Sequence, residues 1–264
     1  MKVNSTVTEG VCVLTLCEPP ANTYSYELMQ ELDRAVLDAR MDPAIHVIVL
    51  TGAGEKFFCA GATIAMLKDA TPEYKYYFCL HANETLNRLE QTPKLVIAAL
   101  NGHTVGGGLE VALAADLRIA KQGTGKIGLP EVALGVLPGT GGTQRLARLL
   151  GKAKAMELLI SGRLMTMDEA QAAGLVTEVW DADRLKEQSF LDAVVEYAKT
   201  FTPPHKASMA VGRIKRAVQS GAEAGFAEGL AIERELQQLL FQSGDAKEGI
   251  AASLEKRKPH FEGR

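Results

Sequence analysis

The chain has 264 residues, of which 47% are hydrophobic and 23% are charged, and its formal net charge at pH 7 is −3. Such a chain is long enough to bury a large core, and its composition is ordinary for a globular protein. It lacks the basic excess of a nucleic-acid-binding protein, so we expect no nucleic-acid partner. The first residues form no apolar signal region, and no run of about 18 apolar residues occurs. We therefore expect a cytoplasmic protein with no membrane span and no membrane partner.

The beginning of the chain alternates predicted strands and helices. Residues 10–16 alternate in hydrophobicity as a strand does, and residues 25–40 carry apolar side chains at helical spacing behind Ser25, a favoured N-cap residue. Residues 47–50 form an apolar run that predicts a buried strand. A strand, a helix and a strand in this order predict parallel pairing, and hence an α/β fold.

Two further segments precede the middle of the chain. Residues 55–64 end a short apolar strand in small residues, and their composition alone indicates only a turn. Thr71 and Pro72 then mark the start of a helix over residues 73–90. This helix carries an aromatic cluster, which is more often core or interface packing than a ligand platform: Tyr74, Tyr76, Tyr77 and Phe78.

The central stretch combines a buried strand with a glycine-rich turn. Residues 95–100 are uniformly apolar, and residues 106–108 are three glycines followed by the helix formers of residues 109–115. The glycines therefore begin a helix, where unpaired N–H groups and the positive end of the helix dipole favour an anion or a developing oxyanion. Glu110 lies in the first turn, where a carboxylate could serve only to match the dipole.

A second carboxylate, Glu131, follows a predicted strand over residues 116–120 and a turn. Pro130 precedes it and apolar residues follow it. A lone glutamate in such surroundings is usually a helix-start residue. The residues by themselves therefore leave open whether Glu131 belongs to a site.

Longer motifs around both carboxylates resemble those of a known family. Residues 101–110 (NGHTVGGGLE), 129–131 (LPE) and 137–146 (LPGTGGTQRL) are similar to the signature of the enoyl-CoA hydratase/isomerase (crotonase) family. Residues 152–159 and 169–176 extend the resemblance nearly from end to end. It implies an α/β fold built as a spiral of repeated ββα units, with a C-terminal helical oligomerisation segment.

The resemblance also implies roles for individual residues. Glu110 and Glu131 would hold one water molecule between them, Glu110 activating it and Glu131 delivering a proton. The backbone N–H groups of Ala62 and Gly107 would form an oxyanion hole. Further substrate-binding positions are Ala60, Gly61, Ile64, Gly106, Pro130 and Gly139. Thr63 stands where family members often have an acid, which leaves the substrate contacts at that position open.

The activity implied is that of an enoyl-CoA hydratase, which adds water across the 2,3 double bond of an acyl-CoA thioester. Coenzyme A would be part of the substrate, and no metal or other cofactor is expected. Isomerisation, pathway-specific dehydration and a non-catalytic or RNA-binding role are the alternatives. Isomerases of the family commonly use one carboxylate, and degenerate members usually lose one or both, so Glu110 and Glu131 together favour water addition. The acyl chain, the pathway and the physiological direction stay open.

The end of the chain is predicted to be helical. Helices are indicated over residues 204–219, 222–241 and 246–257, the last with Asp245 and Glu248 in a capping-box arrangement. We divide the chain into a spiral core with the active site, residues 1–200, and a helical segment, residues 201–264.

The resemblance implies that this helical segment builds a trimer, or a hexamer of two trimers, and closes the active site. An apolar row supports assembly, because it would be partly wet in a monomer: Phe226, Leu230, Leu236 and Leu240. The basic residues 256–258 would be either a solvated tail or contacts for the 3′-phosphate of coenzyme A.

The remaining candidate ligands give weaker signals. The glycines of residues 139–142 are not followed by the GK[ST] sequence of a P-loop. His103, the only histidine near the glycines, is interpreted as structural. Four cysteines lack metal-ligand spacing and are expected to be reduced, mostly core residues: Cys12, Cys17, Cys59 and Cys79.

Overall fold

The computed structural model describes residues 1–264 and contains two β-sheets. The strands of the six-stranded sheet, in spatial order, are β1 (Val3–Thr8), β2 (Val11–Leu16), β3 (Val47–Gly52), β5 (Leu95–Leu100), β7 (Leu117–Lys121) and β9 (Glu178–Trp180). The smaller sheet contains β4 (Phe57–Cys59), β6 (His103–Val105) and β8 (Ile127–Gly128). Only β1 pairs antiparallel with its neighbour, and all other pairs are parallel as predicted.

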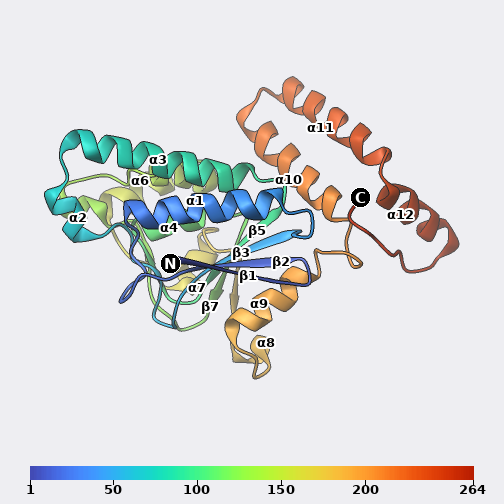
Figure 1. The fold of residues 1–264 in the computed structure, drawn as a ribbon. Coiled ribbons are helices and arrows are strands. Elements are labelled where there is room, and N and C mark those ends of the chain that lie inside the picture. Colours follow the sequence, from blue (N-terminus) through green and yellow to red (C-terminus); the bar gives the residue numbers. More distant parts are fainter.

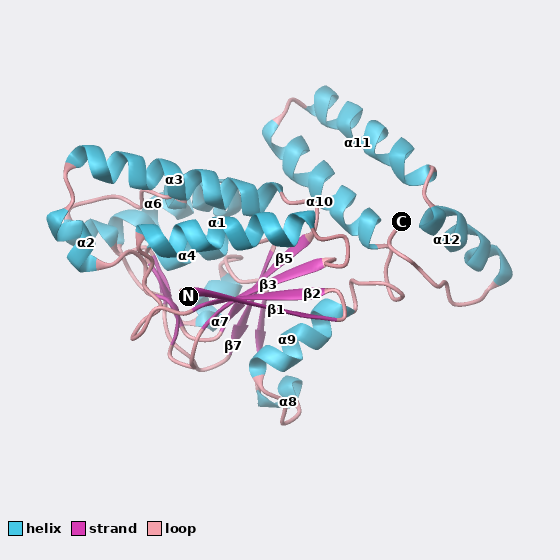
Figure 2. Cartoon of the chain, in the orientation of Figure 1, coloured by secondary structure: helices cyan, strands magenta, loops and turns pink.

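Helices connect the strands and form the end of the chain (Figure 2). They are α1 (Tyr26–Met41), α2 (Ile64–Asp69), α3 (Pro72–Gln91), α4 (Gly107–Leu113), the 3₁₀ helix η1 (Glu131–Leu134), α5 (Gly142–Leu150), α6 (Lys152–Ser161), α7 (Met167–Ala172), α8 (Ala182–Leu185), α9 (Phe190–Lys199), α10 (Ser208–Glu223), α11 (Phe226–Phe241) and α12 (Gly244–Glu255).

A strand of the large sheet, a strand of the small sheet and a helix follow one another repeatedly along the chain. The first complete unit is β3, β4 and α3, and the second is β5, β6 and α4. The repeated ββα unit expected from the family resemblance is therefore present.

Helices cover both faces of the large sheet. Helices α1 and α3 lie on one side of it and α9 on the other (Figure 1). A core cluster of 39 buried residues includes Leu32 and Leu86 from the first pair of helices, and a second cluster of 14 includes Phe190 from α9. Every residue of β3 and β5 is buried, because helices shield both faces. This explains why these strands are continuous apolar runs.

The predicted helix starts at Ser25 and Thr71 are confirmed, and those of the C-terminal helices are wrong. The helices predicted over residues 204–219 and 222–241 are α10 (Ser208–Glu223) and α11 (Phe226–Phe241). The side chains of Ser25 and Thr71 accept hydrogen bonds from N–H groups in the first turns of α1 and α3. In α12 the N-cap is Ser243 and not Asp245. The Asp245 carboxylate instead accepts the N–H groups of Glu262 and Gly263, at 2.8 and 2.9 Å, and fixes the end of the chain.

Several strands differ from expectation, and the short strands β6 and β8 were not predicted. Strand β1 was not predicted. Val3 is its only buried residue, and a strand at the edge of a sheet needs no apolar face. The last strand, β9, is shorter than the apolar pattern of residues 175–180 suggests. Leu175 and Val176 are buried in the turn that follows α7 and do not belong to the sheet.

The C-terminal helices extend away from the sheet (Figure 1). Helix α10 attaches them to the core, where Lys215 forms a 2.8 Å ion pair with Asp116 and donates to the backbone oxygen of Lys94. Both partners lie where strands of the large sheet begin. Helix α11 has no buried residue, and Phe226 is 84% exposed. In one chain, Phe226 and Leu230 of the apolar row are exposed and Leu236 and Leu240 are partly exposed, while assembly itself stays a prediction.

Candidate active site

The N-terminus of α4 lies directly after the carboxyl end of β6 and is tightly packed. Gly106 is its N-cap residue with φ +57°, a left-handed value that favours glycine. A Cβ on Gly108 would lie 2.0 Å from the backbone oxygen of Cys59, so strand β4 approaches the helix start as closely as backbone allows. Residues 106–108 are glycines because of the positive φ at the first and the lack of room for a Cβ at the other two, which the sequence alone did not show.

Ala62 and Gly107 come from different repeat units and lie at the same place. A Cβ on Gly61 would be 2.9 Å from the backbone nitrogen of Gly107. Tyr24 pairs with this strand-like segment, donating its N–H to Gly61 O at 2.9 Å and accepting the N–H of Thr63 at 3.2 Å. The N–H of Ala62 lies between these two bonds and takes part in neither. Gly107 is the first residue of α4, so its N–H has no partner within the helix.

Glu110 lies one turn further along α4 and is only 2% exposed. Its carboxylate is held by the loop before α5. Oε1 accepts the backbone N–H groups of Thr140 at 2.8 Å and Gly142 at 2.7 Å, and Oε2 accepts the Thr140 hydroxyl. Burial raises the pKa of Glu110, while the hydrogen bonds from Thr140 and Gly142 act in the opposite direction. The side chain is thus fixed in one orientation with both oxygens satisfied.

Glu131 is the first residue of η1, with Pro130 as its N-cap residue. Its Oε1 lies over Gly106, because a Cβ there would be 3.0 Å from it. Its Oε2 is buried and has no hydrogen-bond partner. Burial raises the pKa of Glu131 to about 7, and the negative charge of Glu110 adds to the effect. A carboxyl group in this state is suited to carry a proton near neutral pH.

The structure brings the other predicted positions to the same region. Ala60 and Gly61 lie between β4 and α2, and Ile64 is the first residue of α2, 63% exposed. Gly139 precedes Thr140, and a Cβ on it would lie 2.9 Å from the Cys79 sulfur of α3. Of the predicted positions, Gly61 and Glu131 lie against the start of α4, and Gly139 directly precedes the Thr140 that holds Glu110.

Sequence reasoning missed two polar side chains of this region, Tyr24 and Thr140. Tyr24 is 2% exposed and its hydroxyl lies 3.1 Å from the Thr140 Oγ1. Thr140 lies within the GTGG part of a quoted motif, and its neighbours gave the only signal available. Of the aromatic cluster on α3, Phe78 is buried and stacks on Tyr24 at 5.8 Å between ring centroids. The other rings of the cluster are exposed, and their influence on substrate choice stays a prediction.

Other candidates from the sequence lie elsewhere or are structural. The His103 Nδ1 accepts the backbone N–H of Lys126, which confirms its structural role. All four cysteines are free, and two of them, Cys12 and Cys59, are buried. No group of three or more His, Cys, Asp and Glu side chains is placed to hold a metal ion. No helix is both long and apolar enough to cross a membrane.

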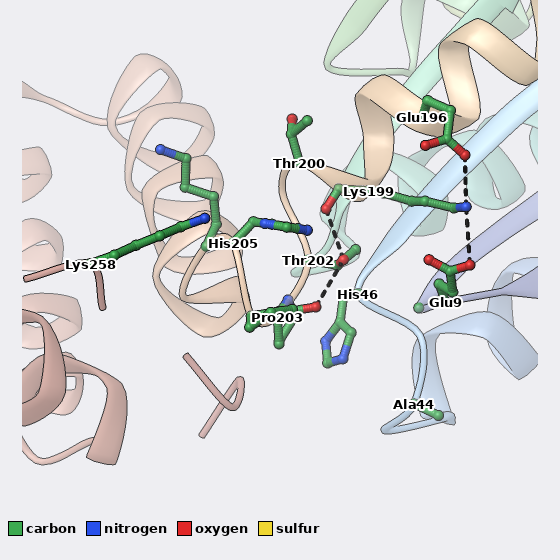
Figure 3. Close-up of a pocket in the computed structure, with 13 residues that line it drawn as sticks. Glu9, Ala44, His46, Glu196, Lys199, Thr200, Thr202, Pro203, His205 and Lys258 are labelled. Carbon is green, nitrogen blue, oxygen red and sulfur yellow. Dashed lines mark hydrogen bonds and ion pairs between the residues drawn. The ribbon is translucent and has the colours of Figure 1, made fainter. Parts of the chain in front are cut away.

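A polar cavity of about 630 Å³ lies near the beginnings of β2 and β3, between the core and the C-terminal helices (Figure 3). Lys199 lines it and forms ion pairs with Glu9 and Glu196, at 3.3 and 2.8 Å. Lys258 also lines it. None of the predicted site residues does, so this cavity is separate from the candidate site. A contact between Lys258 and a thioester bound at the site of the same chain has no support in this arrangement.

Comparison with known proteins places this architecture. Residues 6–264 match the family model described as enoyl-CoA hydratase/isomerase. The chain belongs to the enoyl-CoA hydratase/isomerase family. A crystal structure from Geobacillus kaustophilus is 44% identical, with a TM-score of 0.94, and the match covers 100% of this chain and 97% of that one. The crotonase fold of this family is therefore the fold of the chain.

Among curated family members, a probable enoyl-CoA hydratase from Rhizobium meliloti is 42% identical over 97% of this chain and 96% of its own length. A short-chain-enoyl-CoA hydratase from Clostridium acetobutylicum is 36% identical over 98% of this chain and 97% of its own length. A crotonyl-CoA hydratase from Syntrophomonas wolfei is 36% identical over 96% of this chain and 95% of its own length. The similarity thus extends over nearly the whole length of each relative.

Proposed function

We propose that this protein is an enoyl-CoA hydratase, a hydro-lyase that reversibly adds water across the 2,3 double bond of an acyl-CoA thioester. The observation that carries the proposal is the pairing of two glutamates at a helix start whose first N–H has no partner within the helix. Glu110 is buried, and one oxygen of the half-buried Glu131 is enclosed without a hydrogen-bond partner. Full-length relatives with hydratase names support the same reaction.

The thioester oxygen would be bound by the N–H groups of Ala62 and Gly107. As water adds to the double bond, negative charge develops on this oxygen, and donors fixed in advance stabilise it. Closely packed backbone is required at such a place, which agrees with the steric need for glycine at positions 106 to 108. No metal or redox cofactor is needed, because coenzyme A enters and leaves with the substrate.

The two carboxyl groups would divide the proton transfers between them. The oxygens of Glu110 accept three hydrogen bonds from Thr140 and Gly142, which suit the ionised state. Glu110 takes a proton from the water molecule as the water oxygen bonds to C3. Glu131 gives its proton to C2. The product gains a hydroxyl on C3 and a hydrogen on C2, and a proton then returns from Glu110 to Glu131 through water.

The substrate-binding positions Ala60, Gly61, Ile64, Gly106, Pro130 and Gly139 would line the path of the thioester. Ile64 is exposed in the single chain. A cytoplasmic location is proposed as well, because four free cysteines suit a reducing compartment.

The test is a hydration assay in which the loss of the conjugated enoyl absorbance is followed with crotonyl-CoA and with longer, branched and aromatic enoyl thioesters. We expect turnover with at least one of them and a 3-hydroxyacyl product. A 3-enoyl thioester serves as the control for isomerisation. Turnover of that compound alone would replace the hydratase assignment with isomerase, and no turnover of any thioester would remove both.

We also propose that the protein assembles as a trimer, or as a hexamer of two trimers, through residues 201–264. The exposed apolar side chains of α11 support this, since a large solvent-exposed apolar surface is unusual in a monomer. Within one chain, this segment bonds to His46, Lys94 and Asp116 near the beginnings of the strands. It also bonds to α5, where Arg148 forms a 2.7 Å ion pair with Glu223. A role of this segment in closing the active site is part of the proposal. Light scattering tests the assembly, and an active monomer at micromolar concentration would contradict it.

A further inference from the structure

Tyr24 contacts three parts of the candidate site: the segment around Ala62, the start of α4 and the loop that holds Glu110. Its backbone bonds to Gly61 and Thr63 on both sides of Ala62. Its hydroxyl lies against the start of α4, because a Cβ on Gly107 would be only 2.1 Å from it. The same hydroxyl is 3.1 Å from the Thr140 Oγ1, and Thr140 in turn binds Glu110.

The direction of these hydrogen bonds follows from the inventory of donors. An ionised Glu110 carboxylate only accepts, so the single hydroxyl proton of Thr140 is donated to Oε2. The Thr140 oxygen must then accept the hydroxyl proton of Tyr24. Burial keeps that proton in place, since it raises the pKa of Tyr24 well above its ordinary value. The result is a chain of two hydrogen bonds, both directed toward the negative charge on Glu110.

This chain lies in a dry environment. Tyr24 is 2% exposed, and Thr140 is 1% exposed. Hydrogen bonds to a charged group are stronger in such surroundings, and neighbouring bonds in a chain polarise one another. Phe78 stacks on the Tyr24 ring and limits its movement.

We infer that Tyr24 and Thr140 are positioning residues for Glu110, which hold its carboxylate ionised and aimed at the bound water while Tyr24 links it to both oxyanion-hole segments. The inference rests on the proposed function. It adds two residues to the reaction that contact neither water nor thioester and act only through Glu110 and Gly107.

Removing a hydrogen-bond donor to the Glu110 carboxylate shifts its pKa in a defined direction. The charged form of Glu110 loses stabilisation, so its pKa rises. When the pH is lowered, the activity that depends on ionised Glu110 is therefore lost earlier, at a higher pH than in the unchanged protein. Apart from Tyr24 itself, the variants leave the titratable groups around Glu110 and Tyr24 in place. These groups are Cys59 of β4, Lys75 and Cys79 of α3, and Glu131 of η1.

The experiment compares Thr140→Val with Thr140→Ser, and Tyr24→Phe with the control Tyr26→Phe, whose ring is partly exposed and packs on His81. We expect Thr140→Val to lower kcat by about 10-fold to 100-fold, the range for a lost hydrogen bond to a charged group. Tyr24→Phe should lower it by several-fold to about 10-fold. In both variants the acid side of the kcat/KM profile moves to higher pH, with little change in KM. Thr140→Ser and Tyr26→Phe should remain close to the unchanged protein.

A second measurement does not depend on turnover. The carboxyl ¹³C NMR signal of Glu110, assigned by its absence in Glu110→Gln, is titrated in the ligand-free protein and its variants. Its midpoint should rise in Thr140→Val and Tyr24→Phe. Failure to hydrate any thioester would refute the proposed function and leave this titration as the test of positioning. Unchanged midpoints in folded variants, or equal behaviour of Thr140→Val and Thr140→Ser, would overturn the inference.

Discussion

Glu110 and Glu131 are the same residue type at one helix start, and their surroundings are opposite. Glu110 is almost completely buried, and three donors from the loop before α5 satisfy its carboxylate. Glu131 is less buried, yet one of its oxygens is enclosed without any partner and its pKa is raised to about 7. Burial raises the pKa of both groups. Three hydrogen bonds from Thr140 and Gly142 counteract it at Glu110, whereas at Glu131 the only such bond comes from its own backbone N–H.

The difference shows how a pair of identical side chains obtains two roles. Hydrogen bonds to the charged form favour a base, and an unpartnered oxygen in a dry place favours an acid. An unpaired buried oxygen such as that of Glu131 also lowers the stability of the folded protein. Under the proposed mechanism, that oxygen faces the substrate.

The largest expected effect comes from neutralising either carboxyl group. Glu110→Gln and Glu131→Gln should each lower kcat by roughly 10² to 10⁴, the range for a positioned base or acid. Because both residues act on one water molecule, the double variant should lose far less than the product of the two single losses. Steady-state kinetics on one enoyl thioester measure all three. A single variant that keeps nearly the native rate would break the assignment of that residue.

A smaller effect is expected on the pH dependence. Glu131 must be protonated to act as the acid, and its pKa is raised to about 7. The kcat/KM value, which reports the free enzyme, should therefore fall as the pH rises through about 7. In Glu131→Gln the residual activity should lose this alkaline decrease, because an amide does not titrate. A decrease that persists unchanged in the variant would assign the titration to another group.

The smallest effect concerns stability. The pKa of Glu131 in the folded protein, about 7, exceeds the ordinary value of 4.5, so the folded state binds more protons between these two pH values. Stability contributed by protonated Glu131 is complete below the lower value and is lost as the pH rises through the higher one. Glu131→Gln should therefore gain stability relative to the unchanged protein on going from about pH 5 to about pH 8.

Urea denaturation at both pH values measures this difference. Glu157→Gln, at an exposed residue whose pKa is lowered from 4.5 by hydrogen bonds with Lys154 and Arg163, provides a control. Its relative change has the opposite sign and falls below about pH 4.5, so its stability relative to the unchanged protein should stay nearly constant between about pH 5 and about pH 8. Parallel stability curves for the Glu131 variant and the unchanged protein would show that Glu131 is ordinary in the folded state, and the contrast with Glu110 would disappear.

Much of the fold could be predicted because it depends on local patterns. Continuous apolar runs indicated β3 and β5, and Ser25 and Thr71 are N-cap residues that act within their own helices. Strand β1 could not be predicted, since its pairing with β2 and not its own residues makes it a strand. At α12, Asp245 has the sequence pattern of a cap, but the chain end bonds its carboxylate.

The sequence by itself determined the class of fold, the glycine junction at residues 106–108 and the two carboxylates, because motif and periodicity are properties of short segments. Only the tertiary structure decided how the carboxylates differ. The partner of Glu110 is Thr140, 30 positions away, and the residue behind it is Tyr24, 116 positions from Thr140. Protonation depends on burial and on donors within about 3 Å. Such neighbours come from separate repeat units, and folding the spiral is what brings them together.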